Sequence, residues 1–80
     1  DRTYRVSGDT AIERVESAFG VKIIESEQDQ EFDTIGGLIA HEMGHVPKRG
    51  EQYNRAGLNF VVLHTKGGAV KWFKVSPSAP

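Results

Sequence analysis

Residues 31–51 read Glu-Phe-Asp-Thr-Ile-Gly-Gly-Leu-Ile-Ala-His-Glu-Met-Gly-His-Val-Pro-Lys-Arg-Gly-Glu, and the rest of the chain is organised around this stretch. Asp33 or Thr34 can cap a helix here. The apolar residues that follow fall on one side of that helix at 100° per residue: Ile35, Leu38, Ile39 and Met43. Gly44 can take the left-handed conformation that ends a helix, and Val46-Pro47 then leads away extended. The stretch therefore predicts a helix that is buried on one side and stops at Gly44.

A strand and another helix are predicted before this stretch. Thr3–Ser7 alternates polar and apolar residues, which is typical of a short strand with Tyr4 and Val6 facing inward. Thr10 with Glu13 three residues later matches a capping box, in which each side chain accepts from the backbone of the other residue. The helix that follows has a buried stripe and a left-handed stop: Ile12, Val15, Phe19 and then Gly20.

The clearest strands are Leu58–Thr65 and Ala69–Ser76, because two glycines between them suit a two-residue hairpin turn. On the face expected under the helices, this turn pairs Phe60 with Val75, Val62 with Phe73, and His64 with Lys71. On the opposite face it pairs Val61 with Lys74, Leu63 with Trp72, and Thr65 with Val70. Val21–Ile24 is a brief strand or an extended link, and Glu51–Asn54 is a short strand. We therefore expect an α+β fold, a small antiparallel sheet with two helices on one face.

Composition narrows the possible functions. The 80 residues suit a single domain spanning 1–80, and the ends of the sequence suggest a fragment of a longer chain. Ten basic and eleven acidic residues give a net charge of −1, so neither nucleic acid nor an anionic membrane is an expected partner. Cysteine is absent, which excludes disulfides and thiolate zinc sites. No apolar run approaches the roughly 20 residues that span a membrane.

His41, Glu42 and His45 spell the His-Glu-x-x-His motif of zinc proteases. That mechanism needs both histidines on one helical face and a third protein ligand. Gly44 interrupts the helix before His45, and a third ligand could come only from His64 or an acidic loop. We therefore interpret the motif as a helix end, and we expect no metal site, no catalytic residue and no cofactor. A zinc hydrolase is a remote alternative.

Three other features admit a functional interpretation. The acidic run Glu25–Glu31 could bind a divalent cation, although a solvated surface loop is favoured. Gly36-Gly37 at a helix start could bring backbone N–H groups to a phosphate, although close helix packing is favoured. The sheet face opposite the helices is unusually apolar, and it is either a second small core or an interaction surface. Its residues are Val61, Leu63, Val70 and Trp72.

The chain resembles the CorC/HlyC transporter-associated domain, found at the C-terminus of magnesium and cobalt efflux proteins and of hemolysin-related proteins. The resemblance is carried by Asp33-Thr34-Ile35-Gly36-Gly37, Gly44-His45-Val46-Pro47 and Gly50-Glu51. The strands at Phe60–Val62 and Val70–Val75 fit the family's C-terminal hairpin, and Tyr4–Gly8 with Ile12 fits its first strand and helix. The family has an apolar residue at the position of Glu42, so this glutamate is a departure from its pattern.

The resemblance implies a non-catalytic regulatory domain that modulates ion transport from the cytoplasmic side. Its implied neighbours in the parent protein are CBS modules and, in some members, a transmembrane domain. A homodimer is a further possible assembly. The family fold is similar to part of the FAD-binding domains of certain oxidases, but the flavin-binding residues have no counterparts here. The alternative function is a small-ligand sensor that binds an adenine nucleotide, FAD or a divalent cation.

Overall fold

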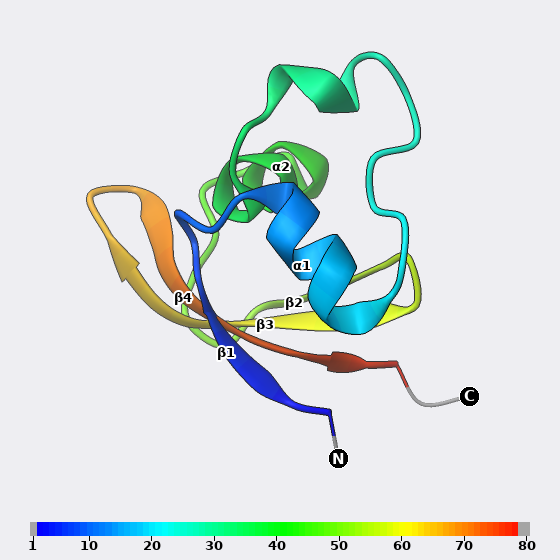
Figure 1. Ribbon diagram of the computed structural model, residues 1–80. Helices are drawn as coiled ribbons and strands as arrows, with labels where there is room; N and C mark the ends of the chain where they lie inside the picture. The colour runs from blue at the N-terminus through cyan, green and yellow to red at the C-terminus, as the bar shows by residue number, and fades with distance from the viewer. Residues whose placement is uncertain (1, 79–80) are drawn as a thin grey trace.

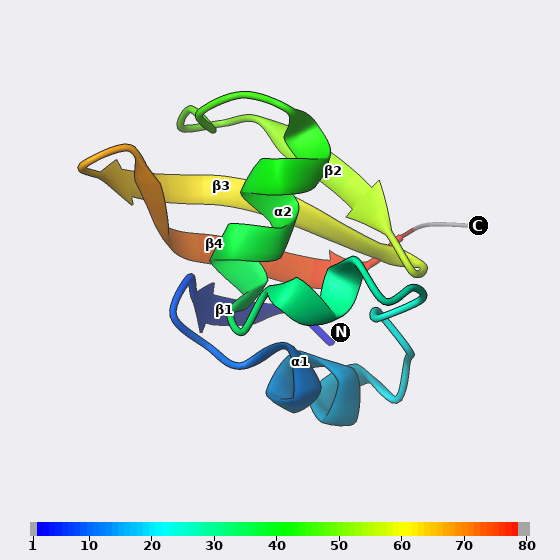
Figure 2. The same ribbon diagram turned by 90° about the horizontal axis from the view of Figure 1, so that it is seen from above.

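The computed structural model of the protein describes residues 2–78. The elements in chain order are β1 (Tyr4–Ser7), α1 (Ile12–Phe19), the 3₁₀ turn η1 (Asp29–Glu31), α2 (Ile35–Met43), β2 (Gln52–Arg55), β3 (Leu58–Lys66) and β4 (Ala69–Pro77). The four strands form an antiparallel sheet in the order β1-β4-β3-β2. Both helices lie on one face of this sheet (Figures 1 and 2), which confirms the α+β fold. Within residues 2–78 no helix has the length and apolar character needed to cross a membrane.

A single apolar core fills the space between the sheet and the helices. Its fully buried side chains come from both helices, from the link after α1 and from the two central strands: Ile12, Ile23, Ile35, Leu38, Ile39, Leu58, Phe60, Val62, Phe73 and Val75. The predicted stripes of both helices are therefore buried, except that Met43 is only partly covered. Tyr4 does turn toward the helices and meets the Phe19 ring edge-on at 5.3 Å, but it stays 48% exposed at the sheet edge.

The link between α1 and η1 is extended rather than a strand. The carboxylate of Glu16 accepts the backbone N–H groups of Ile23 at 2.7 Å and Ile24 at 3.0 Å. These bonds orient the link so that the Ile23 side chain enters the core. A short run of four apolar and basic residues cannot show this from its own pattern, because the acceptor comes from the preceding helix.

The starts of the two helices are joined through their backbones. Residues 10–12 run antiparallel to residues 33–35, with an isolated bridge at their centre. Two hydrogen bonds hold them together: Ile12 N–H donates to the Asp33 carbonyl (3.4 Å), and Ile35 N–H donates to the Thr10 carbonyl (2.9 Å). The first N–H groups of a helix have no acceptor within it, and here each helix start receives one from the other.

The predicted capping box at Thr10 and Glu13 is wrong. Helix α1 begins at Ile12 with Ala11 as its N-cap, and no side chain accepts a hydrogen bond there. The Asp33 carbonyl instead accepts the first helical N–H group, that of Ile12. At α2 the predicted cap is correct, because the Thr34 hydroxyl accepts from Gly37 N–H at 3.2 Å. Both helices end, as predicted, at a left-handed glycine.

Gly8 and Gly36 lie where α2 crosses the end of β1. Gly36 N–H donates to the Gly8 carbonyl at 3.0 Å. A Cβ atom added at Gly36 would lie 2.8 Å from that oxygen, and one added at Gly8 would lie 2.0 Å from the Val70 carbonyl oxygen. Two backbones approach so closely here that only glycine fits at either position, which supports the packing interpretation of the glycine pair.

The hairpin register differs from the prediction in the half next to the turn. Two of the predicted pairs are wrong, because His64 lies opposite Trp72 and the ladder is irregular on both sides of this pair. Leu63 on β3 and Lys71 on β4 are left without opposing partners, so the two irregularities offset each other before the turn. As a result Val70 points to the helix-covered side, where it is only 5% exposed. Val70 therefore does not belong to the outer surface predicted for it.

The Gly8–Gly36 crossing predicts a difference between two neighbouring alanine substitutions. Gly36→Ala should destabilise the protein by about 1–3 kcal/mol, because the new methyl group overpacks against backbone. Gly37→Ala should be neutral or stabilising by up to about 1 kcal/mol from helix propensity, since its Cβ would meet only side-chain atoms, the nearest at 3.2 Å. Urea unfolding of both variants measures the difference. A Gly36→Ala variant as stable as the Gly37→Ala variant would contradict the predicted overpacking.

Candidate functional site

The three residues of the zinc-like motif have three separate environments. His41 is exposed near the end of α2, and its ring lies 4.9 Å from the Phe32 ring, centroid to centroid. His45 lies beyond the left-handed Gly44 that ends the helix. Its Nδ1 atom contacts the Met43 carbonyl at 3.0 Å, and its Nε2 atom contacts the Glu51 carboxylate at 2.8 Å. Both ring nitrogens are therefore engaged by oxygen atoms within the fold, and neither faces an open metal position.

Glu42 has a partner that the sequence analysis did not identify. Its carboxylate accepts hydrogen bonds from the Arg55 guanidinium and from the Tyr53 hydroxyl, the latter at 3.3 Å. Burial, followed by the charge of Glu42, raises the pKa of the Tyr53 hydroxyl, which keeps its proton available for donation. These contacts explain how a charged residue can occupy a turn of α2 that faces the protein. Glu42 therefore forms an ion pair with Arg55 and is not positioned as a general base beside a metal-bound water.

Arg55, at the end of β2, is the centre of a nearly buried ion network. Its guanidinium also donates to the Asp29 carboxylate at 2.8 Å and to the Ile23 carbonyl at 2.8 Å. The side chains of Arg55 and Asp29 are each only 11% exposed, so both charges depend on these contacts. One arginine thus joins the link after α1, the acidic loop and the end of α2. Arg55 was not among the site residues predicted from the sequence, although its spacing of two from Tyr53 indicates the same inward-facing side.

Asp29 organises the acidic loop, which is not simply a solvated surface loop. Its carboxylate accepts the backbone N–H groups of Glu25 at 2.9 Å and Ser26 at 3.2 Å, in addition to Arg55. The bond from the Glu25 backbone is the main cause that lowers the pKa of Asp29, and the Arg55 charge adds to it against the opposing effect of burial. Within residues 2–78 no three His, Asp or Glu side chains are grouped to hold a metal ion.

The loop after α2 is closed by Glu51. Its carboxylate accepts from the Lys48 backbone N–H at 2.6 Å as well as from His45. The hydrogen bond with His45 is the main cause that lowers the pKa of Glu51. The conformation of the Gly44–Glu51 segment is therefore determined by its own residues, and His45 has a structural role here.

The glycine pair at the start of α2 offers no free anion site. Gly36 N–H donates to the Gly8 carbonyl, and Gly37 N–H donates to the Thr34 hydroxyl. Both groups that could bind a phosphate are therefore already used within the fold.

The sheet face opposite the helices is open (Figure 1). Three of the four residues predicted for the interaction surface, Val61, Leu63 and Trp72, are half-buried, while Val70 is in the core. The Arg5 guanidinium lies over the Trp72 ring, 4.8 Å from its centroid. We call Val61, Leu63 and Trp72 the outer apolar patch.

The sequence profile of the transporter associated domain CorC_HlyC matches residues 1–79. The chain belongs to this family. A relative named magnesium and cobalt efflux protein CorC, from Vibrio cholerae, is 43% identical over 60 residues, which are 75% of this chain and 19% of that protein. The chain spans between 14% and 19% of the lengths of the first curated relatives that it matches.

Solved CorC_HlyC domains have the same fold. The crystal structure of a Mg²⁺ and Co²⁺ transporter (CorC) associated region from Neisseria meningitidis is 35% identical, with a TM-score of 0.81 over 94% of this chain and 88% of that chain. A CorC_HlyC domain from Haemophilus ducreyi gives a TM-score of 0.84 at 19% identity, over 98% of this chain and 99% of that chain. A chain of this length therefore folds as an isolated domain in that relative.

The environments of His41 and His45 predict that purified protein contains no stoichiometric zinc. Metal analysis by mass spectrometry after dialysis against zinc-free buffer measures the content. His41→Ala should leave that content unchanged, since the ring lies against Phe32 rather than beside His45. One zinc per chain that disappears in His41→Ala would establish a metal site at the motif.

The lowered pKa of Asp29 predicts a pH dependence of stability. Because the folded-state pKa of Asp29 lies below its ordinary value of 3.8, the stabilisation that the ionised carboxylate provides is present above that pH and is lost as pH falls through the folded-state pKa. Asp29→Asn should therefore be less stable than the wild type at neutral pH, and the difference should shrink in acid. Urea unfolding over a pH series measures this, with the exposed Glu27→Gln as control. A difference that does not change with pH would contradict it.

Proposed function

We propose that this CorC_HlyC domain is a non-catalytic regulatory module of a magnesium and cobalt efflux protein related to the hemolysins. It acts on the cytoplasmic side and modulates ion transport through contacts with neighbouring domains. The single observation that carries the proposal is the 43% identity to the Vibrio cholerae efflux protein across three quarters of this chain. The local geometry supports it, since His41, Glu42 and His45 are held by contacts that serve the fold.

The outer apolar patch is the surface proposed for this contact, and a neighbouring domain of the same parent protein is its proposed partner. Val61 and Leu63 on β3 and Trp72 on β4 form a strip on the uncovered face of the sheet. Two basic residues, Arg5 and Lys74, border the strip on the same face. Uncharged polar residues line a hollow at the other end of that face: Gln52, Asn54, Asn59, Ser76 and Ser78. The relatives are more than five times as long as the matched region, so the parent protein contains ample chain to cover the patch. CBS modules are the neighbours that the family resemblance implies.

The proposed role can be tested by transport measurements on the parent protein. Deleting the domain should leave cobalt efflux measurable but change its dependence on cytoplasmic magnesium. Leu63→Asp should reproduce the regulatory change, because a carboxylate in the patch would be desolvated by the partner domain. The control Ser17→Asp should not, because it places the same carboxylate at an exposed position of α1, on the other side of the sheet. Cobalt efflux from membrane vesicles at several magnesium concentrations is the measurement.

Two outcomes would contradict the proposal. Regulation that survives deletion of the domain would remove the regulatory role. Sedimentation of the isolated domain distinguishes the partner: a monomer is expected, and a dimer that Trp72→Asp dissociates would assign the outer apolar patch to a second copy of the chain.

A further inference from the structure

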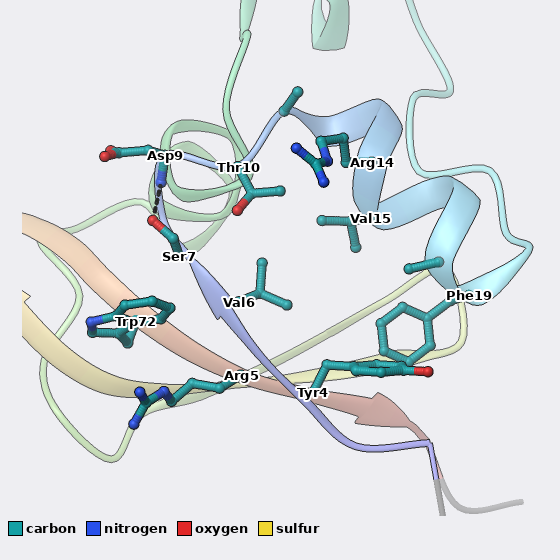
Figure 3. A pocket seen from close by; sticks show the side chains of 12 residues that line it. Tyr4, Arg5, Val6, Ser7, Asp9, Thr10, Arg14, Val15, Phe19 and Trp72 are labelled. Atoms are coloured by element: carbon teal, nitrogen blue, oxygen red, sulfur yellow. Dashed lines mark hydrogen bonds between the residues drawn. The ribbon is translucent and has the colours of Figure 1, made fainter.

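An open groove of about 620 Å³ lies between β1 and α1 (Figure 3). Tyr4 and Val6 from the strand, with Val15 and Phe19 from the helix, form its apolar wall under α1. The groove continues around the edge of β1 to the other face of the sheet, where Arg5 and Trp72 form its outer wall. Successive strand residues point to opposite faces, so both walls belong to one edge.

The free edge of β1 lies within this groove. β1 is the outermost strand of the sheet and pairs only with β4. Gly8 N–H donates to the Lys71 carbonyl at 3.0 Å, and hydrogen-bonded positions alternate along an antiparallel pair. Val6 and Tyr4 therefore direct their backbone groups toward β4, whereas Arg5 directs its N–H and C=O groups into the groove. Within residues 2–78 no other segment hydrogen-bonds to the backbone of Arg5 at this edge.

We propose that the groove binds an extended peptide segment of a partner protein, which adds to β1 as an edge strand beneath α1. An edge strand next to a helix is a recurring geometry for peptide recognition, in which main-chain hydrogen bonds supply affinity and alternate side chains supply specificity. The volume of the groove is within the range of about 300–1,000 Å³ that is usual for binding pockets. This site is separate from the outer apolar patch, apart from Trp72, which borders both.

The charges of the groove define the chemistry of the peptide. Arg5 lines the outer wall and Arg14 projects from α1 over the wall under the helix (Figure 3), while Asp9 is an acidic residue at one end. The groove therefore favours a peptide in which acidic side chains alternate with apolar ones. Since alternate side chains of the peptide point to opposite faces, its acidic groups would meet Arg5 on the outer wall and its apolar groups would cover Val6 and Val15 under α1. Arg14 would add positive charge from the helix side.

A second copy of the chain fits the edge less well. A symmetric pairing of two β1 strands centred on the exposed backbone groups of Arg5 would place two Arg5 side chains directly opposite each other. Like charges in directly opposite positions destabilise a strand pair. An acidic peptide avoids this repulsion and neutralises the arginine instead.

The probe for the experiment is an acetylated and amidated octapeptide of alternating glutamate and valine, titrated into the ¹⁵N-labelled domain. We expect shifts of the backbone amides of Arg5 and Ser7, and a change in the fluorescence of Trp72, the only tryptophan in the sequence. A matched peptide with lysine in place of glutamate should bind at least roughly tenfold more weakly, because its charges oppose those of the groove.

Two variants locate the site, and both are checked for folding by circular dichroism. Arg14→Glu should weaken binding by roughly tenfold, since it reverses a charge on the groove wall. The control Lys22→Glu makes the same charge change at an exposed residue outside the groove and should have no effect. Ala18→Trp fills the groove without altering charge and should abolish binding.

Several results would overturn the proposal. One is the absence of shifts at Arg5 and Ser7 with the acidic peptide at millimolar concentration. Another is equal binding of the acidic and basic peptides. Shifts confined to Val61 and Leu63 would assign the peptide to the outer apolar patch instead. A dimer of the free domain in which the Arg5 amide is protected from exchange would show that a second copy occupies the edge.

Discussion

The fold depends on the backbone contact between residues 8–12 and residues 33–36. The first N–H groups of a helix need acceptors from outside it, and here the segment before each helix supplies acceptors to the other. This exchange brings the main chains so close that Gly8 and Gly36 have no room for a side chain. This contact sets the angle at which α2 crosses the sheet, and therefore how deeply the apolar stripe of α2 packs into the core.

Features set by local chemistry could be predicted from the sequence. The left-handed stops at Gly20 and Gly44, the Thr34 cap and the two-glycine hairpin turn each depend on a few adjacent residues. The failures involve distant partners. The capping box at Thr10 does not form, and the Asp33 carbonyl, from the segment before α2, accepts the Ile12 N–H instead. The irregular pairing that turns Val70 inward arises from the sheet as a whole, and alternation along one strand cannot show it.

The candidate site shows the same contrast between features set by adjacent residues and features set by distant partners. The sequence predicted that the helix ends at Gly44, before His45, and the structure confirms this end. Glu42 stands where the family resemblance implies an apolar residue, and the structure pairs this charge with Arg55. Identifying Arg55 as that partner requires knowing where the end of β2 lies, and this depends on the sheet register. Of the four residues predicted for the apolar sheet face, Val61, Leu63 and Trp72 are half-buried, and the hairpin irregularity places Val70 in the core.

The position of Arg55 in the chain also affects the order in which the molecule assembles. Arg55 comes 26 residues after Asp29 and 13 after Glu42, so both carboxylates leave the ribosome before their counter-charge does. Until β2 has paired with β3, the acidic loop carries negative charge with nothing to hold it against the helices. The N-terminal half can therefore collapse around its apolar residues, but this loop closes late. Its ordering reports completion of the sheet, because contacts between distant residues form only after the intervening loop is closed.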